Sequence, residues 1–444
     1  MIGRCMNIPT RKISKMLQFL IVICFSGIFL TSTAEPADTA EPADTAEPAD
    51  KVYKAALEKG KLAVDWYTKR SGIKTSSDYY ADICAFYGSC IFGDAIGDNS
   101  IFDHINSRYK RTNPINTGDI DLNSCGILPL HLYLHNKNTN QLKLGTDAAD
   151  ANIAKGGHFR TAIDDTYMTG SLMVQAYRAT KDKKYLDFCA DYMVKYINAL
   201  QQNNGLYWHR HVSKQYWGRG NGWAAAGNAE LIQIIPKDHK KYNEVITGFK
   251  KHMKGLIDVQ LDNGMWPQLL ASKDSKNWEE TSGTSMFIFA LFTGLELDIL
   301  DKETFLEPAK KGWMAVIKYL SNDGRLDNIA RGFWPKAGTP EEYLNAPKGG
   351  KGDSHGTAGF IWAATAIVRY YKVEHTGVIR FPNQPSHLSI KTVEPVQQWS
   401  LFDLRGRKIL GAGHKNNTMT LPIGIVIRST NAPNRSIRKM LRID

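Results

Sequence analysis

The sequence predicts an all-α fold over most of its length, and three observations support this. Six stretches place apolar residues three and four positions apart, which is the period of an amphipathic helix. They cover residues 167–179, 184–200, 223–235, 242–261, 284–295 and 308–320. Gly, Asn and Asp, which commonly end helices, lie in the connections. Strand-like alternation is scarce between residues 51 and 374.

A sequence repeat indicates how these helices are arranged. Asn-Asn-Gly at 203–205, Asp-Asn-Gly at 262–264 and Asn-Asp-Gly at 322–324 each follow an apolar helical stretch, and their glycines lie 59 and 60 residues apart. This period fits one pair of antiparallel helices with two loops, so the region holds five to six such pairs. Six hairpins can close into a double-layered toroid with a central cleft. An open helical solenoid is the alternative.

The N-terminal region differs from the rest in composition. Residues 1–34 contain basic residues, then an apolar run, then small residues, which predicts a secretory signal peptide. The apolar run is shorter than the roughly 20 residues of a spanning helix, so we expect no transmembrane span after signal removal. Residues 35–50 repeat Glu-Pro-Ala-Asp-Thr-Ala and predict a disordered linker. Residues 51–374 then form the predicted helical domain.

The C-terminal region, residues 375–444, predicts a small β-rich domain. Four short stretches, separated by Pro and Gly, resemble strands. They are 388–392, 398–402, 407–410 and 423–427.

The distribution of charge limits the classes of partner. The formal net charge is +12, with +4 in residues 1–34, −6 in 35–50 and +8 in 375–444. The middle of the chain has no stripe dense in Lys and Arg, so no nucleic-acid partner is expected. A mild positive field around a cleft favours an anionic substrate. Ten Trp and nineteen Tyr suit carbohydrate binding or, equally, a well-packed core.

Four cysteines remain after signal removal: Cys84, Cys90, Cys125 and Cys189. Export permits disulfides, and Cys84 and Cys90 are the nearest pair in sequence. Buried free thiols are the alternative.

Two adjacent carboxylates, Asp164 and Asp165, stand at the expected start of a helix in the sequence AIDDTYM. Neighbouring side chains there face different directions. One carboxylate can cap the free backbone amides of the helix, while the other points into a cleft. The alternative is that both act as caps or face solvent.

A glycine-rich motif, YWGRGNGW at 216–223, frames Arg219 with Trp217 and Trp223. Three glycines in five residues let the backbone approach a ligand closely. A guanidinium can hold a carboxylate through two parallel hydrogen bonds, and the indole rings suit a sugar. The glycine spacing does not fit a phosphate-binding loop. A purely structural turn is the alternative.

Two further motifs occupy expected helix entrances. ETSGTSMF at 280–287 offers hydroxyl groups that cap the next helix or bind a sugar, and DSHGTAG at 353–359 is a weaker candidate. His209 and His211 are two residues apart with no third ligand nearby, so neither a metal nor a cofactor is expected. No Gly-x-Ser-x-Gly motif supports a serine hydrolase.

Taken together and in this order, the motifs resemble glycoside hydrolase family 105, the unsaturated rhamnogalacturonyl hydrolases. They are more distantly similar to family 88, the unsaturated glucuronyl hydrolases. The matching stretches are AIDDTYM, GLYWH, YWGRGNGW and ETSGTSMF. The resemblance covers residues 51–374 and implies an (α/α)6 barrel. It also implies hydrolysis that removes a 4,5-unsaturated uronic acid from the non-reducing end of lyase-generated oligosaccharides, of rhamnogalacturonan or ulvan type.

The resemblance also implies the roles of individual residues. The substrate is an enol ether, so one carboxyl group protonates carbon 4 and then helps water to attack carbon 5. The family motif places this group at Asp164, with Asp165 as a rival, and a second cleft carboxylate at Asp121. The implied substrate-binding residues are Arg160, His209, Trp217, Arg219, Asn221, Trp223, Thr281, Ser282 and His355. Among these, Arg219 holds the uronate carboxylate, the two tryptophans flank the sugar and His209 lies near its hydroxyls. At Arg160 the chain departs from the family's usual run.

Three other functions are weighed against this one: an unsaturated glucuronyl hydrolase for other uronate polysaccharides, a non-catalytic carbohydrate-binding surface protein, and a polysaccharide lyase on the same toroid. The tail resembles the sorting domains of type IX secretion substrates, which implies that machinery as a partner. The expected location is outside the cytoplasm: secreted, at the cell surface or periplasmic.

Overall fold

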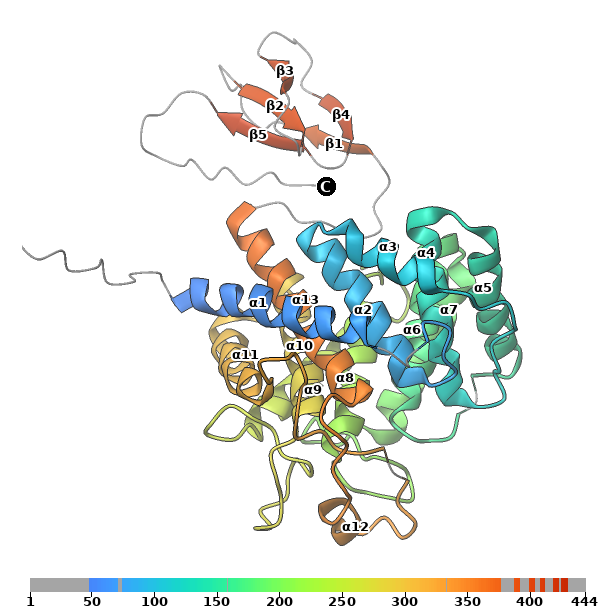
Figure 1. The fold of residues 1–444 in the computed structure, drawn as a ribbon, viewed down its shortest axis with the longest axis vertical. Helices are drawn as coiled ribbons and strands as arrows, with labels where there is room; N and C mark the ends of the chain where they lie inside the picture. Colours follow the sequence, from blue (N-terminus) through green and yellow to red (C-terminus); the bar gives the residue numbers. More distant parts are fainter. Residues whose placement is uncertain are drawn as a thin grey trace, which may run out of the picture. The chain divides into compact units, whose positions relative to one another are not determined.

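A computed structural model describes residues 48–70, 74–157, 159–332 and 334–376, and five short strands between 387 and 429 (Figure 1). The predicted signal peptide and residues 35–47 of the predicted linker lie outside the described residues. The last three residues of that predicted linker belong instead to the first helix, which begins at Pro48. Proline is favoured at this position because its fixed φ suits a helix and its missing N–H has no partner to lose.

The described helices form two concentric layers. The inner helices are α2 (Tyr80–Ile96), α4 (Ile127–Asn136), α6 (Asp165–Thr180), α8 (Gly218–Ile232), α10 (Thr281–Glu296) and α13 (Ser354–Thr376). The outer helices are α1 (Pro48–Lys69), α3 (Asn99–Arg108), α5 (Thr139–Ala154), α7 (Lys183–Leu200), α9 (Tyr242–Asp258) and α11 (Lys302–Val316). Three short helices lie in the connections: η1 (Ile120–Gly126), η2 (Ile317–Tyr319) and α12 (Pro340–Leu344).

The inner layer is a closed ring. Each inner helix packs against the next, and α13 packs against both α10 and α2. This closure confirms the predicted toroid and rules out the open solenoid for the described helices. It also explains the burial pattern, because every residue of α8 is buried whereas α9 buries one face. A helix surrounded on all sides is apolar or internally bonded all round, while an outer helix is amphipathic.

The repeated Gly turns link neighbouring hairpins. Gly205, Gly264 and Gly324 have φ of 86°, 94° and 86°, in the left-handed region that glycine tolerates best. In each turn a Cβ atom would collide with a backbone carbonyl of the next outer helix: with Lys251 in α9, with Lys311 in α11 and with Leu62 in α1. The third turn therefore meets the first helix of the barrel. The sequence repeat reflects one contact that recurs around the ring.

Helix α8 begins five residues before the expected start at 223, so the glycine-rich motif forms its first turn. The backbone N–H of Asn221 donates to the Trp217 carbonyl at 2.9 Å, which is a helical bond. A Cβ atom on Gly283 would lie 2.8 Å from the carbonyl carbon of Gly218. Glycine here lets α8 and α10 approach each other closely. From the sequence, we expected these glycines to let the backbone approach a ligand. In the structure they allow a close approach between α8 and α10.

All four cysteines of the helical domain are free and buried. Cys84 and Cys90 lie on the same helix, α2. Six residues along a helix span about 9 Å, beyond the Cα separation that a disulfide can bridge. The free-thiol alternative is therefore correct.

In the tail, the structure describes strands β1 (His387–Lys391), β2 (Trp399–Asp403), β3 (Lys408–Gly411), β4 (Thr418–Pro422) and β5 (Ile425–Ser429). Strand β1 pairs antiparallel with β4, and β2 pairs antiparallel with both β3 and β5. The rest of residues 377–444 lies outside the described residues, so the small β domain stays a prediction. No described helix combines the length and apolar character needed to cross a bilayer.

Candidate active site

The candidate site lies where the chain enters the inner helices. The connections into α8, α10 and α13 run over 201–217, 259–280 and 320–353, whereas those that leave α2, α4 and α6 contain two residues each. Most residues singled out from the sequence stand in the long connections or in the first turn of the helix that follows. The fold thus gathers motifs from five hairpins at one end of the ring.

The two adjacent carboxylates have different surroundings. Asp165 is fully buried and accepts hydrogen bonds from the backbone N–H of Arg160 at 3.1 Å, from its Nε at 2.7 Å and from the Tyr196 hydroxyl. Complete burial raises the pKa of Asp165 to about 6, against the opposite pull of the guanidinium. Neither Asp164 nor Asp165 caps the helix, contrary to expectation. Asp165 holds the Arg160 segment instead.

Asp164 is the less engaged of the two. Its Oδ2 atom lies 3.4 Å from Nε2 of His209, and its side chain is 15% exposed. Among the described residues, Oδ2 has no hydrogen-bond partner. Burial by itself raises the pKa of Asp164, but His209 and Arg160 outweigh it and hold the pKa below its usual value. Asp165 is therefore engaged within the protein, whereas Asp164 is partly exposed and makes fewer contacts.

Arg160 connects the second cleft carboxylate to this pair. Its Nη2 atom lies 2.6 Å from an oxygen of Asp121 and 2.6 Å from an oxygen of Asp165. Burial raises the pKa of Asp121, and the charge of Asp164 adds to this, while Arg160 opposes it. The family resemblance implied a substrate-binding role for Arg160. In the structure it positions the two aspartates.

His209 is buried and held on both sides. Its Nδ1 atom is 2.7 Å from the Tyr343 hydroxyl, which is 2.6 Å from Ser213 Oγ, and its Nε2 faces Asp164. The imidazole and the Trp217 ring are 4.7 Å apart between centroids. His211, by contrast, is exposed.

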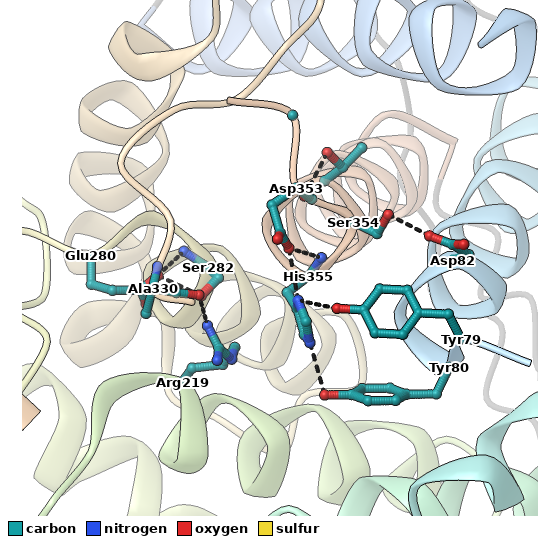
Figure 2. A network of polar contacts seen from close by, with 12 residues as sticks. Tyr79, Tyr80, Asp82, Arg219, Glu280, Ser282, Ala330, Asp353, Ser354 and His355 are labelled. Atoms are coloured by element: carbon teal, nitrogen blue, oxygen red, sulfur yellow. Dashed lines mark hydrogen bonds and ion pairs between the residues drawn. The ribbon is translucent and has the colours of Figure 1, made fainter. Parts of the chain in front are cut away.

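Arg219 is a buried cation in the first turn of α8 (Figure 2). Its Nη1 donates to the Ala330 carbonyl, and its guanidinium carbon lies 4.7 Å from the centroid of the Trp217 ring. Its Nε is buried without a hydrogen-bond partner, and within the described chain no carboxylate forms an ion pair with it. The nearby Glu280 carboxylate is already engaged by the backbone N–H groups of Ser282, Gly283 and Ala330.

His355, at the start of α13, lies between Tyr79, Tyr80 and Asp353 (Figure 2). Its Nε2 is 2.8 Å from the Tyr80 hydroxyl, and its Nδ1 is 2.7 Å from Asp353. Burial lowers the pKa of His355 and favours the neutral imidazole. Arg219, Asp121 and Asp164 all act on the pKa of Tyr80. Tyr80 therefore lies within electrostatic reach of the predicted site residues, although the sequence did not point to it.

Four predicted substrate contacts are enclosed by protein, so they do not offer the expected free groups. Asn221 bonds to the backbone of Tyr207 and Trp217. The hydroxyl of Thr281 donates to backbone carbonyls, and that of Ser282 donates to Glu280. Trp223 is completely buried against Tyr167, Trp362 and Tyr80. Polar groups inside a ring of helices need internal partners, and the contacts of these four side chains in the structure lie within the protein.

Trp334 is an exposed aromatic side chain next to the candidate site residues Arg160 and His209. Trp334 is 50% exposed, and the guanidinium carbons of Arg160 and Arg210 lie 5.5 and 4.1 Å from its ring centroid. Its ring is 5.9 Å from that of His209. The only sequence signal was an aromatic residue in a Gly- and Pro-containing connection. Trp217, by contrast, is 2% exposed.

Comparison with known proteins gives the family. The family model Glycosyl Hydrolase Family 88 matches residues 73–371. An unsaturated 3S-rhamnoglycuronyl hydrolase of Alteromonas sp. (strain LOR) is 30% identical over 174 residues, 37% of this chain and 42% of that protein. The protein of that name from Formosa agariphila is 27% identical over 157 residues, 35% of this chain and 39% of its own. The chain thus matches less than half the length of these two relatives.

A solved structure extends the comparison over the barrel. The glycoside hydrolase from family 105 of C. acetobutylicum ATCC 824 superposes with a TM-score of 0.61 at 21% identity. The superposition covers 69% of this chain and 98% of that one, which shows a shared fold. The family match, the closed double ring of helices and the gathered motifs agree with one another. The chain belongs to glycosyl hydrolase family 88.

Proposed function

We propose that this protein removes a 4,5-unsaturated uronic acid from the non-reducing end of oligosaccharides produced by a polysaccharide lyase. The uronate is linked to rhamnose or sulfated rhamnose, in oligosaccharides of rhamnogalacturonan or ulvan type. Family membership supports the reaction class, and the names of the two relatives support the substrate class.

The observation that carries the proposal is the buried, unpaired guanidinium of Arg219. A buried charge without a partner is costly, and the Nε donor of Arg219 has no acceptor within the described chain. A planar carboxylate on the substrate supplies both the missing charge and the missing acceptor. Several inner helices also direct their N-termini to this end, and helix N-termini favour anions.

Asp164 is proposed as the acid and base. As a carboxylic acid it donates its proton to carbon 4 of the enol ether while the double bond opens. As a carboxylate it then takes a proton from water, whose oxygen bonds to carbon 5. The product is a hemiketal. Its ring opens to give a ketone at carbon 5 and a hemiacetal at carbon 1. The hemiacetal then collapses to an aldehyde and releases the second sugar as an alcohol, so the net change is the addition of one water molecule.

The protonated form of Asp164 depends on the substrate. In the free protein its pKa is held below the usual value by His209 and Arg160. An anionic uronate bound beside it, with water excluded, raises that pKa through like charge and desolvation. Substrate binding therefore favours the protonated form of Asp164, which the first step of the reaction needs. His209 contacts the Asp164 carboxyl on the side away from the substrate. Asp121 and Arg160 hold the segment of the chain next to Asp164.

The experiment is incubation with unsaturated disaccharides released by lyases from ulvan and from rhamnogalacturonan, followed by absorbance of the enol ether. Loss of absorbance, with release of the reducing sugar, is expected. A matched disaccharide with a saturated uronate is the control and should remain intact. A rise in absorbance on intact polysaccharide would indicate a lyase, and binding without any change would indicate a carbohydrate-binding protein. Turnover restricted to other uronate disaccharides would indicate an unsaturated glucuronyl hydrolase.

We also propose that the protein is exported, with residues 1–34 removed and residues 375–444 read by the type IX secretion machinery. The composition of the two ends supports this proposal. N-terminal sequencing of the mature protein, and fractionation of cells that express the chain with and without residues 375–444, test it.

A further inference from the structure

A second cluster of polar side chains lies at the opposite end of the inner helices. Asp94 is two residues before the end of α2, and His135 is one residue before the end of α4, with His131 one turn earlier. Residues four apart on a helix share a face, so both imidazoles face Asp94. Tyr80, in the candidate active site, is 14 residues from Asp94 along α2, which is about 21 Å of helix.

The spacing of the ligand atoms in this cluster is compatible with one bound metal ion. His131 Nε2 is 3.2 Å from one carboxylate oxygen of Asp94, and His135 Nε2 is 3.2 Å from the other. One ligand atom from each of the three residues can be chosen so that all lie within 4.8 Å of one another. Two ligand atoms on one tetrahedral zinc ion, at about 2.0–2.2 Å each, lie roughly 3.4 Å apart. One ion can therefore reach all three residues after small adjustments.

The burial of His131 adds a second observation. Its side chain is only 7% exposed, and its Nε2, which lies 3.2 Å from the Asp94 carboxylate, makes no hydrogen bond of good geometry among the described residues. A buried polar atom without a hydrogen bond is rare in native proteins. A metal ion that accepts the nitrogen lone pair would satisfy it.

The surroundings hold the imidazoles in place and favour positive charge. The Phe102 ring stacks on His135 with centroids 4.5 Å apart, and the Tyr87 ring meets His131 edge-on at 5.4 Å. The C-termini of α2 and α4 both end beside the cluster, and helix C-termini carry partial negative charge. Two imidazoles and one carboxylate are a donor set that suits zinc.

We infer that Asp94, His131 and His135 bind one zinc-class divalent ion, which ties α2 to α4 at the end of the barrel opposite the active site. The ion takes three ligands from the protein and keeps a position for water. The sequence alone suggested no metal, because Asp94 lies 37 residues before His131 and the three residues meet only in the fold. The inference does not depend on the proposed reaction.

The test is equilibrium dialysis of the metal-stripped, tag-free protein against Zn²⁺, with bound metal measured by mass spectrometry. We expect one Zn²⁺ per chain, no comparable binding of Mg²⁺ or Ca²⁺, and a rise in Tm when Zn²⁺ is present. His135→Ala and the nearly isosteric Asp94→Asn should each lose the bound zinc and the rise in Tm. His211→Ala is the matched control and should keep both, because His211 is an exposed histidine outside the cluster.

Circular dichroism and Tm without metal show whether each variant is folded. If His135→Ala does not fold, Asp94→Asn still tests the inference. Binding of Co²⁺ should give a visible absorption band that both cluster variants lack. Absence of stoichiometric zinc binding would overturn the inference. So would zinc binding that survives in both cluster variants, or binding that is lost only in His211→Ala.

Discussion

The two ends of the helical ring are built from the same inner helices but have opposite chemical character. At one end, long connections enter the helix N-termini, and these connections and the first helical turn of α8 carry Asp164, His209, Arg219 and Trp334. At the other, connections of two residues leave α2, α4 and α6, and the cluster of Asp94, His131 and His135 lies near the C-termini of α2 and α4. Helix dipoles favour anions at the first end and cations at the second.

The difference shows which part of such a fold carries specificity. A two-residue connection is almost fully used in capping its helices, as at Asp182, whose side chain accepts from the backbone N–H of Lys184 at 3.0 Å. A long connection can place side chains over the end of the helical ring without interrupting the packing of the inner helices. Substitutions at the cleft end should therefore change turnover, and those at the short end should change stability.

The largest effect is expected at Asp164, the proposed catalytic carboxyl. Asp164→Asn should lower turnover by about 100- to 10,000-fold, because the amide can neither donate the proton nor accept it back. The Tm should stay close to that of the unmodified protein, since Asp164 is only loosely engaged. The enol-ether assay and thermal unfolding measure both quantities. Full activity in this variant would contradict the proposed role.

Arg219→Lys tests whether this residue recognises the uronate carboxylate of the substrate. A charge-assisted hydrogen bond contributes about 1.5–3 kcal/mol, so kcat/KM should fall by about 10- to 150-fold. The loss should appear mainly in KM if the contact is the same in the ground and transition states. The control substrate is the methyl-esterified disaccharide, which lacks the carboxylate charge. Equal losses on both substrates would mean that Arg219 only packs on Trp217.

Asp165→Asn tests whether the neighbouring carboxylate is structural. The substitution weakens the contacts with Arg160 and Tyr196, and hydrogen bonds to charged groups are each worth about 1.5–3 kcal/mol. A lower free energy of unfolding by about this amount is expected in denaturant titration. The folded variant should keep more turnover than Asp164→Asn. The reverse order of activities would exchange the roles of the two aspartates.

Trp334→Ala examines the exposed ring at the cleft. Loss of a flat apolar surface should weaken substrate binding by about 0.5–1.5 kcal/mol, which is roughly two- to tenfold in KM. Stability should change little, because the ring is half exposed. Trp334→Phe is the matched variant and should recover part of the affinity. An unchanged KM in Trp334→Ala would remove this residue from the substrate site.

At the short-connection end, Asp182→Ala should leave turnover unchanged. Loss of the helix cap should lower the free energy of unfolding by about 0.5–2 kcal/mol. Asp182→Asn, which can still accept the hydrogen bond, is the control and should be close to the unmodified protein. A marked loss of turnover in the alanine variant would show that the two ends are coupled.

Much of the architecture could be predicted because its signals are local. The helical period and the recurring Gly turns are readable from residues close together in sequence, and the turns at Gly205, Gly264 and Gly324 proved structurally equivalent. The start of α8 was placed too late because three glycines argue against a helix by intrinsic propensity. Close packing against α10 decides that segment instead. Local propensity gives no information about this contact between α8 and α10.

The predicted site was less complete for the same reason. The sequence brought attention to Asp164, Arg219 and His209, which the structure gathers at one end. It could not distinguish a hydroxyl or an indole that faces substrate from one enclosed by helices, as at Thr281 and Trp223. That distinction depends on what covers the side chain, and the covering residues are remote in sequence.

By itself, the sequence determined the all-α hairpin pattern, the repeat and the family resemblance, since all three follow from residue types at fixed spacings. Only the tertiary structure decided which of two adjacent aspartates is available. Arg160 lies five residues before Asp165, Tyr196 lies 31 after it, and His209 lies 45 after Asp164. Side chains of neighbouring residues at a helix start point in directions about 100° apart. The free carboxyl is therefore set by which remote partners the closed ring brings to each side.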